Sequence, residues 1–144
     1  SSSMPLVSPM VNIDGVPYLD GGVADSVPIR HALKSGNAKI IVVLTRNPGY
    51  RKKPVSKGTA KLYRKAYKSY PKMATCAVHR NRMYNRTMEL VEKLEAEGRI
   101  YVIRPMVPTV SRLERDYDKL MSFYEHGYAL MKKEYANLLR YMEE

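Results

Sequence analysis

The sequence contains no tryptophan, one phenylalanine and one cysteine among its 144 residues. Because Cys76 has no second cysteine to pair with, an internal disulfide is excluded, and the composition fits a reducing compartment. The aromatic residues are mostly tyrosine, of which there are twelve. Each tyrosine combines an apolar ring with a hydroxyl that needs a partner or water. We therefore expect amphipathic aromatic surfaces in this chain.

Long apolar runs are also missing. No stretch approaches the roughly 20 apolar residues of a membrane-spanning helix. The first residues, SSSMPLVSPMV, lack the basic start and apolar centre of a signal peptide. The localisation that we expect is cytoplasmic, with a peripheral membrane contact. The opening residues resemble the interior of a longer protein more than a natural N-terminus.

Acidic residues are absent from a long central segment. From Ser26 to Thr87 the sequence has sixteen Lys or Arg and no Asp or Glu, whereas residues 1–25 have three acids and no Lys or Arg. Residues 88–144 have nine basic and eleven acidic residues, so the net charge of +11 belongs to the central segment. Such a segment indicates either a solvated basic surface or a platform for the phosphates of lipid or nucleic acid.

The beginning of the chain predicts short elements. Asp14-Gly15 between apolar residues predicts a hairpin over 10–19, because a type I′ turn requires positive φ. A short helix is expected over 26–36, capped by Ser26 and ended by a glycine.

A β-branched run over 38–46 predicts a strand buried on both faces, as in a parallel sheet. A second short strand is expected over 99–105. A strand buried on both faces needs neighbours that these residues hardly supply. This again indicates a missing upstream segment or a second chain.

Helices are expected in most of the remaining sequence. After a loop over 47–58, a helix over 59–70 should end at Pro71. Its two faces repeat at helical spacing. One is aromatic and apolar, with Tyr63, Ala66, Tyr67 and Tyr70, and the other is cationic, with Lys61, Arg64, Lys65 and Lys68.

A longer helix is expected over 72–97, with Gly98 as its stop and a buried stripe of Tyr84, Met88, Val91 and Leu94. The final helical region should open with a capping box formed by Ser111 and Glu114, and Gly127 is a possible break in it. A stripe at helical spacing continues almost to the end, and it is more typical of a packing face than of a cofactor site. Its members are Tyr117, Leu120, Met121, Tyr124, Tyr128, Met131, Tyr135, Leu138 and Met142.

Several kinds of chemistry find no support in the sequence. The three histidines have no close His or Cys partner, so no metal site is expected. No G-x-S-x-G is present, and therefore no serine of this chain is assigned as a nucleophile. Cys76 and His79 would share a helix face, but nothing nearby supplies an oxyanion hole for a Cys-His pair. We expect no cofactor.

Asp20 is the strongest catalytic candidate. It follows a predicted strand and precedes Gly21 and Gly22, which allow a tight turn and the close approach of a partner. In α/β sheets, catalytic carboxylates are typically found on loops at the ends of strands. A plain turn in which the Asp side chain bonds its own backbone is the alternative, and local chemistry alone favours it.

The first third of the chain resembles the end of the catalytic domain of patatin-like phospholipases. The resemblance covers residues 1–46 and is carried by a run of small residues, an Asp-Gly hairpin turn, a tyrosine in the next strand, a D-G-[GA] motif and a helix-starting proline. In this sequence these are Ser1–Ser3, Asp14-Gly15, Tyr18, Asp20-Gly21-Gly22 and Pro28. Further on, HRNRMYN, IYVIRP and the tyrosine-rich end resemble, more weakly, the C-terminal extension of a bacterial branch of that family.

The resemblance implies a serine hydrolase that cleaves lipid acyl esters with a Ser-Asp dyad and no histidine. The dyad aspartate would be Asp20, acting as the proton acceptor, with Gly21 and Gly22 completing the motif. The implied fold is α/β, with residues 1–46 as the last part of a three-layer sandwich, a loop over 47–58 and a mainly helical extension over 59–144 with a short strand near 100–104. The serine and the oxyanion hole would lie in a missing N-terminal half, so the chain alone should be inactive.

The charge pattern indicates two further partners. Lys61, Arg64, Lys65 and Lys68 are candidates for contact with an anionic membrane. A nucleic-acid-binding module is the alternative, because tyrosines interleave with the basic residues. No nucleic-acid recognition motif accompanies them, so nucleic acid is the less favoured partner. A non-catalytic interaction domain, packing through the terminal Tyr/Met helix, is a third possibility.

Overall fold

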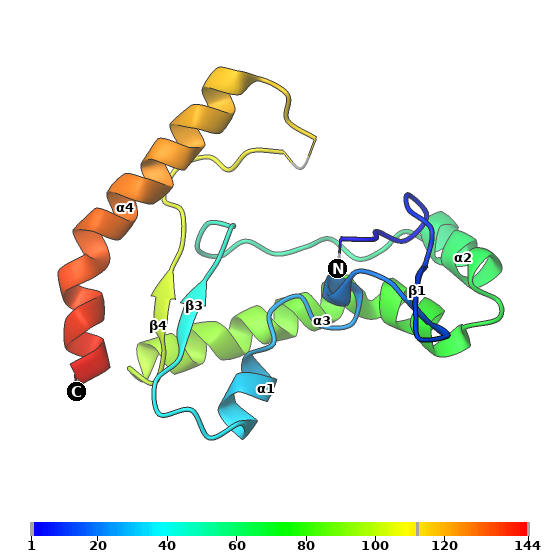
Figure 1. Ribbon diagram of the computed structural model, residues 1–144, viewed down its shortest axis with the longest axis horizontal. Coiled ribbons are helices and arrows are strands. Elements are labelled where there is room, and N and C mark those ends of the chain that lie inside the picture. Colours follow the sequence, from blue (N-terminus) through cyan, green and yellow to red (C-terminus); the bar gives the residue numbers. More distant parts are fainter. Residues whose placement is uncertain (1, 112, 144) are drawn as a thin grey trace. The chain divides into compact units, whose positions relative to one another are not determined.

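The computed structural model describes residues 2–111 and 113–143, and Figure 1 shows its elements. The chain is mixed α/β, with two two-stranded sheets and a mainly helical C-terminal part, as the sequence predicts. Ser1, the first of the three small residues at the start, lies outside the described residues. The elements in chain order are β1 Val11–Ile13, β2 Val16–Tyr18, the 3-10 helix η1 Gly21–Val23, α1 Ile29–Lys34, β3 Ile41–Val43, α2 Lys57–Ala66, α3 Pro71–Ala96, β4 Tyr101–Ile103 and α4 Tyr117–Glu143.

Two compact units make up the described chain. Unit 1 consists of residues from 1–29 and 51–90, and unit 2 consists of residues from 30–50 and 91–144. Each unit is built from two separate stretches of sequence. Helix α3 contributes residues to both units, because the boundary between them, after residue 90, falls within this helix.

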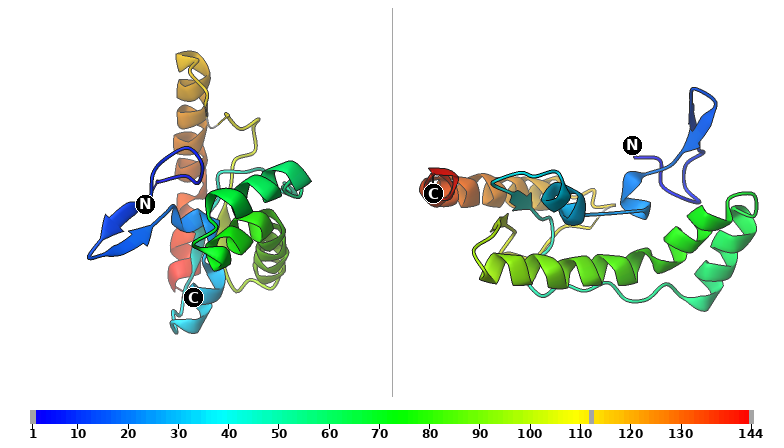
Figure 2. Two further views of the ribbon diagram at one scale, coloured as in Figure 1. Left: turned by 90° about the vertical axis from the view of Figure 1, so that its right-hand side faces the viewer. Right: turned by 90° about the horizontal axis from the view of Figure 1, so that it is seen from below.

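The hairpin in unit 1 confirms the predicted turn. β1 and β2 pair antiparallel, and Ile13 lies opposite Val16. Asp14 has φ 50° and Gly15 has φ 80°, so both residues occupy the left-handed region that a type I′ turn requires. All six strand residues are exposed. The hairpin therefore presents both faces to its surroundings (Figure 2).

Helix α2 begins earlier and ends earlier than the sequence predicts. The Ser56 side chain caps it by accepting a hydrogen bond from the Thr59 N–H. The helix ends at Ala66, and Tyr67 already has non-helical angles. Pro71 is the first residue of α3, where its missing N–H costs nothing, so the chain turns before the proline.

The predicted aromatic face of α2 is confirmed only in part. Tyr63 and Tyr67 are half-buried, whereas Ala66 and Tyr70 are exposed. The Tyr67 hydroxyl accepts a hydrogen bond of 2.9 Å from the Leu6 N–H, which attaches the beginning of the chain to the end of α2.

The predicted long helix and its buried stripe are confirmed in α3. Its buried apolar residues are Ala74, Ala77, Tyr84 and Met88 in unit 1, and Val91 and Leu94 in unit 2. Gly98 has φ 68° and ends the helix. The N–H of Gly98 bonds the carbonyl of Glu95, and the N–H of Arg99 bonds that of Leu94, which is the Schellman pattern.

Two asparagines of α3 hold the extended segment before α2. The Asn85 side chain accepts from the Lys52 N–H at 2.8 Å and donates to the Lys52 carbonyl at 3.0 Å. Asn81 donates to the carbonyl of Lys53 at 2.8 Å. Lys52 also lies over the Tyr84 ring, 3.9 Å from its centroid. Asn81 and Asn85 are four residues apart and share one face of the helix, so they bond adjacent residues of the segment.

In unit 2, β3 and β4 form a parallel pair in which Val42 lies opposite Val102. The sequence predicts a strand over 38–46 that is buried on both faces, and this expectation is wrong for the described residues. Val42 is buried, but Ile41 is 41% exposed and Val43 is 70% exposed. The reason is that side chains alternate along a strand, and the described residues cover only one side of this small sheet.

The start of α4 differs from the predicted capping box. Ser111 and Glu114 do not cap the helix. The Ser111 hydroxyl accepts from the Leu113 N–H, and the Glu114 carboxylate accepts from the N–H groups of the two residues after it. Asp116 caps α4 instead, because its carboxylate accepts from the Lys119 N–H at 3.2 Å. This backbone hydrogen bond lowers the pKa of Asp116. Arg112, which also falls in the predicted opening of the helix, lies outside the described residues.

Gly127 does not break α4, which runs without interruption from Tyr117 to Glu143. Two tyrosine hydroxyls attach this helix to the parallel sheet. Tyr101 donates to the Glu134 carboxylate at 2.6 Å, and the Tyr141 hydroxyl accepts from the Ile40 N–H at 3.2 Å. One side of α4 is thereby held beside β4 (Figure 1).

The bond between Tyr101 and Glu134 predicts a pH-dependent contribution to stability. Burial, together with the hydrogen bond to Glu134, raises the pKa of Tyr101 to about 12. The same hydrogen bond lowers the pKa of Glu134 from its ordinary 4.5. We expect Tyr101→Phe to cost about 1 kcal/mol of unfolding free energy at pH 7, measured by urea unfolding.

The direction of each pKa shift determines the pH range in which the bond between Tyr101 and Glu134 stabilises the fold. The Glu134 contribution is complete above 4.5 and is lost as the pH falls through the lowered pKa. The Tyr101 contribution is complete below 10.0 and is lost as the pH rises toward about 12. The difference in unfolding free energy between the wild type and Tyr101→Phe should therefore become smaller at low pH and at high pH. Tyr70→Phe is the control, because that side chain is 44% exposed and lies outside α4. An equal difference at pH 7 and pH 3 would contradict the prediction.

Candidate functional site around Asp20

Asp20 lies directly after the hairpin and caps the short helix η1. Its Oδ1 accepts a hydrogen bond of 2.8 Å from the Gly22 N–H. Its own N–H donates to the Ser3 carbonyl at 2.9 Å. The backbone and one carboxylate oxygen of Asp20 are therefore both fixed by neighbours within unit 1. This is the local Asp turn that the Asp-Gly-Gly sequence predicts.

The two glycines of the motif have different roles. A Cβ added to Gly21 would meet no atom within 4 Å, whereas one added to Gly22 would lie 3.1 Å from Asp20 Oδ1. The lack of a side chain at Gly22 therefore lets the carboxylate approach the Gly22 N–H without crowding. Gly21 is not required by any contact of this kind.

The second carboxylate oxygen of Asp20 has no hydrogen-bond partner among the residues that the structure describes. The side chain is half-buried. The arrangement thus presents an oriented carboxylate with one oxygen available to accept a proton from a hydroxyl group. An orienting bond to one oxygen, with the other left for the reacting group, is what a general base needs.

Ser26 supports this turn in a way that the sequence does not predict. We expected Ser26 to cap the following helix, but its hydroxyl donates to the Gly22 carbonyl at 2.9 Å. Both polar groups of the Gly22 backbone are therefore bonded by side chains of this loop. The Asp25 carboxylate accepts a hydrogen bond of 3.2 Å from the Val27 N–H, so it belongs to the segment that leads into α1.

The described serine side chains near Asp20 form no hydrogen bond with its carboxylate. Ser3 is close through its backbone, but its hydroxyl donates to the Pro9 carbonyl. Within the described residues no hydrogen bond joins a serine hydroxyl to Asp20.

The predicted cationic face of α2 is present but shorter than expected. Lys61, Arg64 and Lys65 are on the helix and exposed, and they form no ion pair with any residue that the structure describes. Lys68 is exposed as well, but it lies beyond the end of the helix. Leu62, on the same helix, is 51% exposed.

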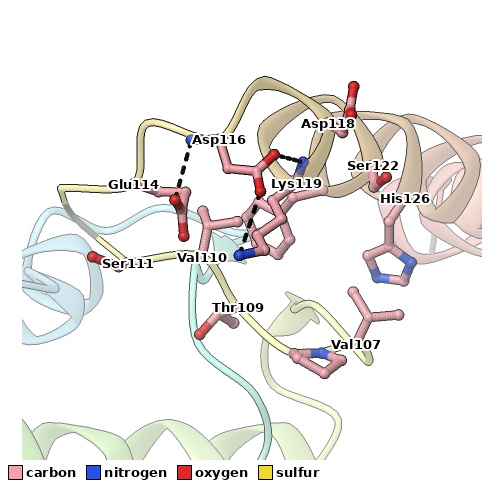
Figure 3. A pocket seen from close by; sticks show the side chains of 12 residues that line it. Val107, Thr109, Val110, Ser111, Glu114, Asp116, Asp118, Lys119, Ser122 and His126 are labelled. Atoms are coloured by element: carbon pink, nitrogen blue, oxygen red, sulfur yellow. Dashed lines mark hydrogen bonds and ion pairs between the residues drawn. The ribbon is translucent and has the colours of Figure 1, made fainter.

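A pocket that the sequence does not predict lies in unit 2 (Figure 3). It has a volume of about 750 Å³ and is formed by the segment 107–111 and the beginning of α4. Several of its polar groups already have partners in the chain. Asp116 pairs with Lys119, and His126 Nε2 accepts from the Met106 N–H at 3.2 Å. No group of three His, Cys, Asp or Glu side chains in the described chain is arranged to hold a metal ion.

The family comparison covers the helical end of the chain. Residues 70–143, just over half of the sequence, match the model of a domain of unknown function, DUF6363. The chain therefore belongs to the DUF6363 family. The matched residues include α3, β4 and α4 but not Asp20. No curated protein matches the chain.

The described helices also bear on membrane insertion. None of them combines the length and the apolar composition that crossing a bilayer requires.

Because the two glycines have different surroundings, alanine substitutions at Gly22 and Gly21 form a matched test of the contact between Gly22 and Asp20. We expect Gly22→Ala to lower the unfolding free energy by about 1 kcal/mol, the size of a lost helix cap, because the new methyl group displaces Asp20 Oδ1. Gly21→Ala should change it by less than about 0.5 kcal/mol. Urea unfolding of both variants measures the difference.

A double-mutant cycle assigns the cost to the carboxylate. In an Asp20→Ala background the contact is gone, so Gly22→Ala should cost clearly less than in the wild type. Equal costs in the two backgrounds would show that Gly22 is required for a reason other than its contact with Asp20.

Proposed function

We propose that this chain supplies the general-base aspartate of a patatin-like lipid acyl hydrolase, a phospholipase or esterase that works with a Ser-Asp dyad. The observation that carries the proposal is the Asp20 carboxylate, which is oriented through one oxygen while the other has no described partner. The motif resemblance over residues 1–46 supplies the family. The 144 residues contain no G-x-S-x-G, so the nucleophile and the oxyanion hole belong to sequence outside them.

The proposed chemistry uses Asp20 twice. In the first step the serine hydroxyl gives its proton to the Asp20 carboxylate, and the serine oxygen forms a bond to the acyl carbon. The bond from that carbon to the alcohol oxygen then breaks, and the alcohol leaves with the proton from Asp20. In the second step water gives a proton to Asp20, and its oxygen forms a bond to the acyl carbon of the acyl-serine. The bond from that carbon to the serine oxygen then breaks, the serine oxygen takes the proton back from Asp20, and the fatty acid is released. The serine oxygen must approach to about 2.6–3.2 Å.

Two features of β3 support a larger sheet. β3 is paired with β4 on one edge, so its other edge has no strand among the described residues. Ile41 and Val43 on this strand are exposed although they are β-branched and apolar. A three-layer sandwich, in which further strands and helices cover this pair, would bury both side chains. The sandwich is therefore part of the proposal.

Asp20→Asn in the complete enzyme, with the upstream segment present, tests the role of the carboxylate. We expect kcat for a p-nitrophenyl ester to fall at least about a thousandfold, because the amide cannot accept the serine proton. Asp25→Asn is the matched control and should retain activity, since Asp25 only bonds the Val27 N–H. The isolated 144-residue chain should have no activity. Hydrolysis by the isolated chain that is lost on Asp20→Asn would overturn the assignment of the nucleophile.

We further propose that α2 contacts the headgroups of an anionic membrane, which would make the enzyme a cytoplasmic protein peripheral to its lipid substrate. The specific observation is that Lys61, Arg64 and Lys65 are exposed without a described ion pair, beside the exposed Leu62. A cation near an anionic surface contributes about 1 kcal/mol, and an apolar side chain can enter the interface. Nucleic acid is the alternative source of phosphates.

Vesicle co-sedimentation tests the membrane contact. Replacing Lys61, Arg64 and Lys65 together by Gln should weaken binding to vesicles containing phosphatidylserine by roughly a hundredfold, at about 1 kcal/mol for each charge. A matched triple replacement of Lys119, Lys133 and Arg140 by Gln removes the same charge outside α2 and should have a much smaller effect. Equal binding to neutral and anionic vesicles would refute the contact. Steeply salt-dependent binding to an oligonucleotide in its place would favour the nucleic-acid alternative.

A further inference from the structure

Helix α4 has a second apolar side that the described chain leaves uncovered. Eight residues follow one another at alternating spacings of four and three along the helix, which is the heptad pattern of a coiled-coil seam. We call this set the α4 seam. Its members are Tyr117, Met121, Tyr124, Tyr128, Met131, Tyr135, Leu138 and Met142.

Apart from Met131, which lines a pocket together with Val43 and Ile103, the α4 seam lies away from the side of α4 that contacts the sheet. The sheet side uses Glu134 and Tyr141, which bond Tyr101 and Ile40. The four tyrosines of the seam are between 56% and 70% exposed, and Met142 is 50% exposed. The other three seam residues are half-buried. No residue in the described part of α4 is buried. An apolar stripe of this length, on a helix about 40 Å long, is typical of a helix that packs against a partner helix.

The seam is complementary to itself when a second copy runs in the opposite direction. In antiparallel coiled coils each a residue faces a d residue of the partner. Tyr117 then faces Met142 of the partner subunit, and Tyr128 faces Met131 of the partner subunit. Tyr124 and Tyr135 face each other, as do Met121 and Leu138. Every seam residue therefore has a facing residue in the second copy. Of the four kinds of facing pair, two place a methionine sulfur against a tyrosine ring, which is a favourable contact.

Charge decides between the two directions. Glu125 and Lys132 flank the α4 seam at equivalent heptad positions. In the antiparallel pair Glu125 lies beside Lys132 of the partner subunit, and twofold symmetry repeats this ion pair. In a parallel pair Glu125 would face Leu120 and Lys132 would face Gly127, which gives no ion pair.

The isolated chain leaves both charges available for this contact. Glu125 is exposed and has no ion-pair partner among the described residues. Lys132 lies with its Nζ 4.6 Å from the centre of the Tyr128 ring, at the edge of the seam. We propose that α4 pairs with α4 of a second copy of this chain as an antiparallel, twofold-symmetric dimer.

A charge swap tests both the partner and its direction. The wild-type chain should sediment at about twice its 16.5 kDa mass at high concentration and dissociate on dilution. Lys132→Glu or Glu125→Lys alone places like charges together twice in each dimer, and we expect Kd to rise about tenfold. The double variant Glu125→Lys/Lys132→Glu restores opposite charges and should return Kd to within about twofold of the wild type. Sedimentation equilibrium measures each constant.

Lys133→Glu is the matched control, because it reverses the same charge one residue away from the flanking position. It should leave Kd nearly unchanged. Circular dichroism establishes that each variant keeps its helices. A wild-type chain that stays monomeric at 200 µM would overturn the proposal, because the seam would then need a different occupant. A dimer whose Kd is not weakened by the single changes, or not restored by the double change, would equally overturn the antiparallel pairing.

Discussion

The apolar stripe of α3 is the constraint on which the rest of the structure depends. It gives Ala74, Ala77, Tyr84 and Met88 to the core of unit 1, and Val91 and Leu94 to the core of unit 2. Unit 1 otherwise buries few side chains, and its hairpin residues are all exposed. The small sheet of unit 2 likewise has one buried residue in β3. The core of each unit therefore depends on the apolar residues of α3 more than on the short strands.

The Schellman end of α3 has a corresponding role in the connection. Gly98 takes a left-handed conformation that other residues rarely adopt, so the chain leaves the helix at a defined point. Ile100 is buried directly after this turn, and β4 begins one residue later. The distance between the helix end and the parallel strand is therefore set by a few residues with little freedom.

Sequence reasoning found those features that a single residue type determines. Positive φ at Asp14, Gly15 and Gly98 could be predicted, because few residues tolerate that region. The α3 stripe was readable from its periodicity. Capping was harder to predict, because several acceptors compete. Asp116 displaced Ser111 and Glu114 at the start of α4, and Ser26 bonded the Gly22 carbonyl instead of capping α1.

The candidate site divides in the same way. Asp20, Gly21 and Gly22 were found from their spacing, and the structure adds the unequal roles of the two glycines. The bonds of Ser26, Asn81 and Asn85 could not be predicted, because each joins a side chain to a backbone group whose position depends on the folded chain. The pocket at the start of α4 depends on the path of residues 107–111, which has no periodic signal.

The bonds from Asn81 and Asn85 have a consequence for how unit 1 responds to ionic strength. They join neutral amides to the backbone of a strongly basic segment, and dissolved ions screen charges rather than neutral hydrogen bonds. Phosphate binding by the exposed lysines would weaken in concentrated salt, while the segment at Lys52 and Lys53 would stay attached to α3. The attachment of this segment to α3 should therefore depend little on salt concentration, whereas any binding through the exposed lysines should depend on it strongly.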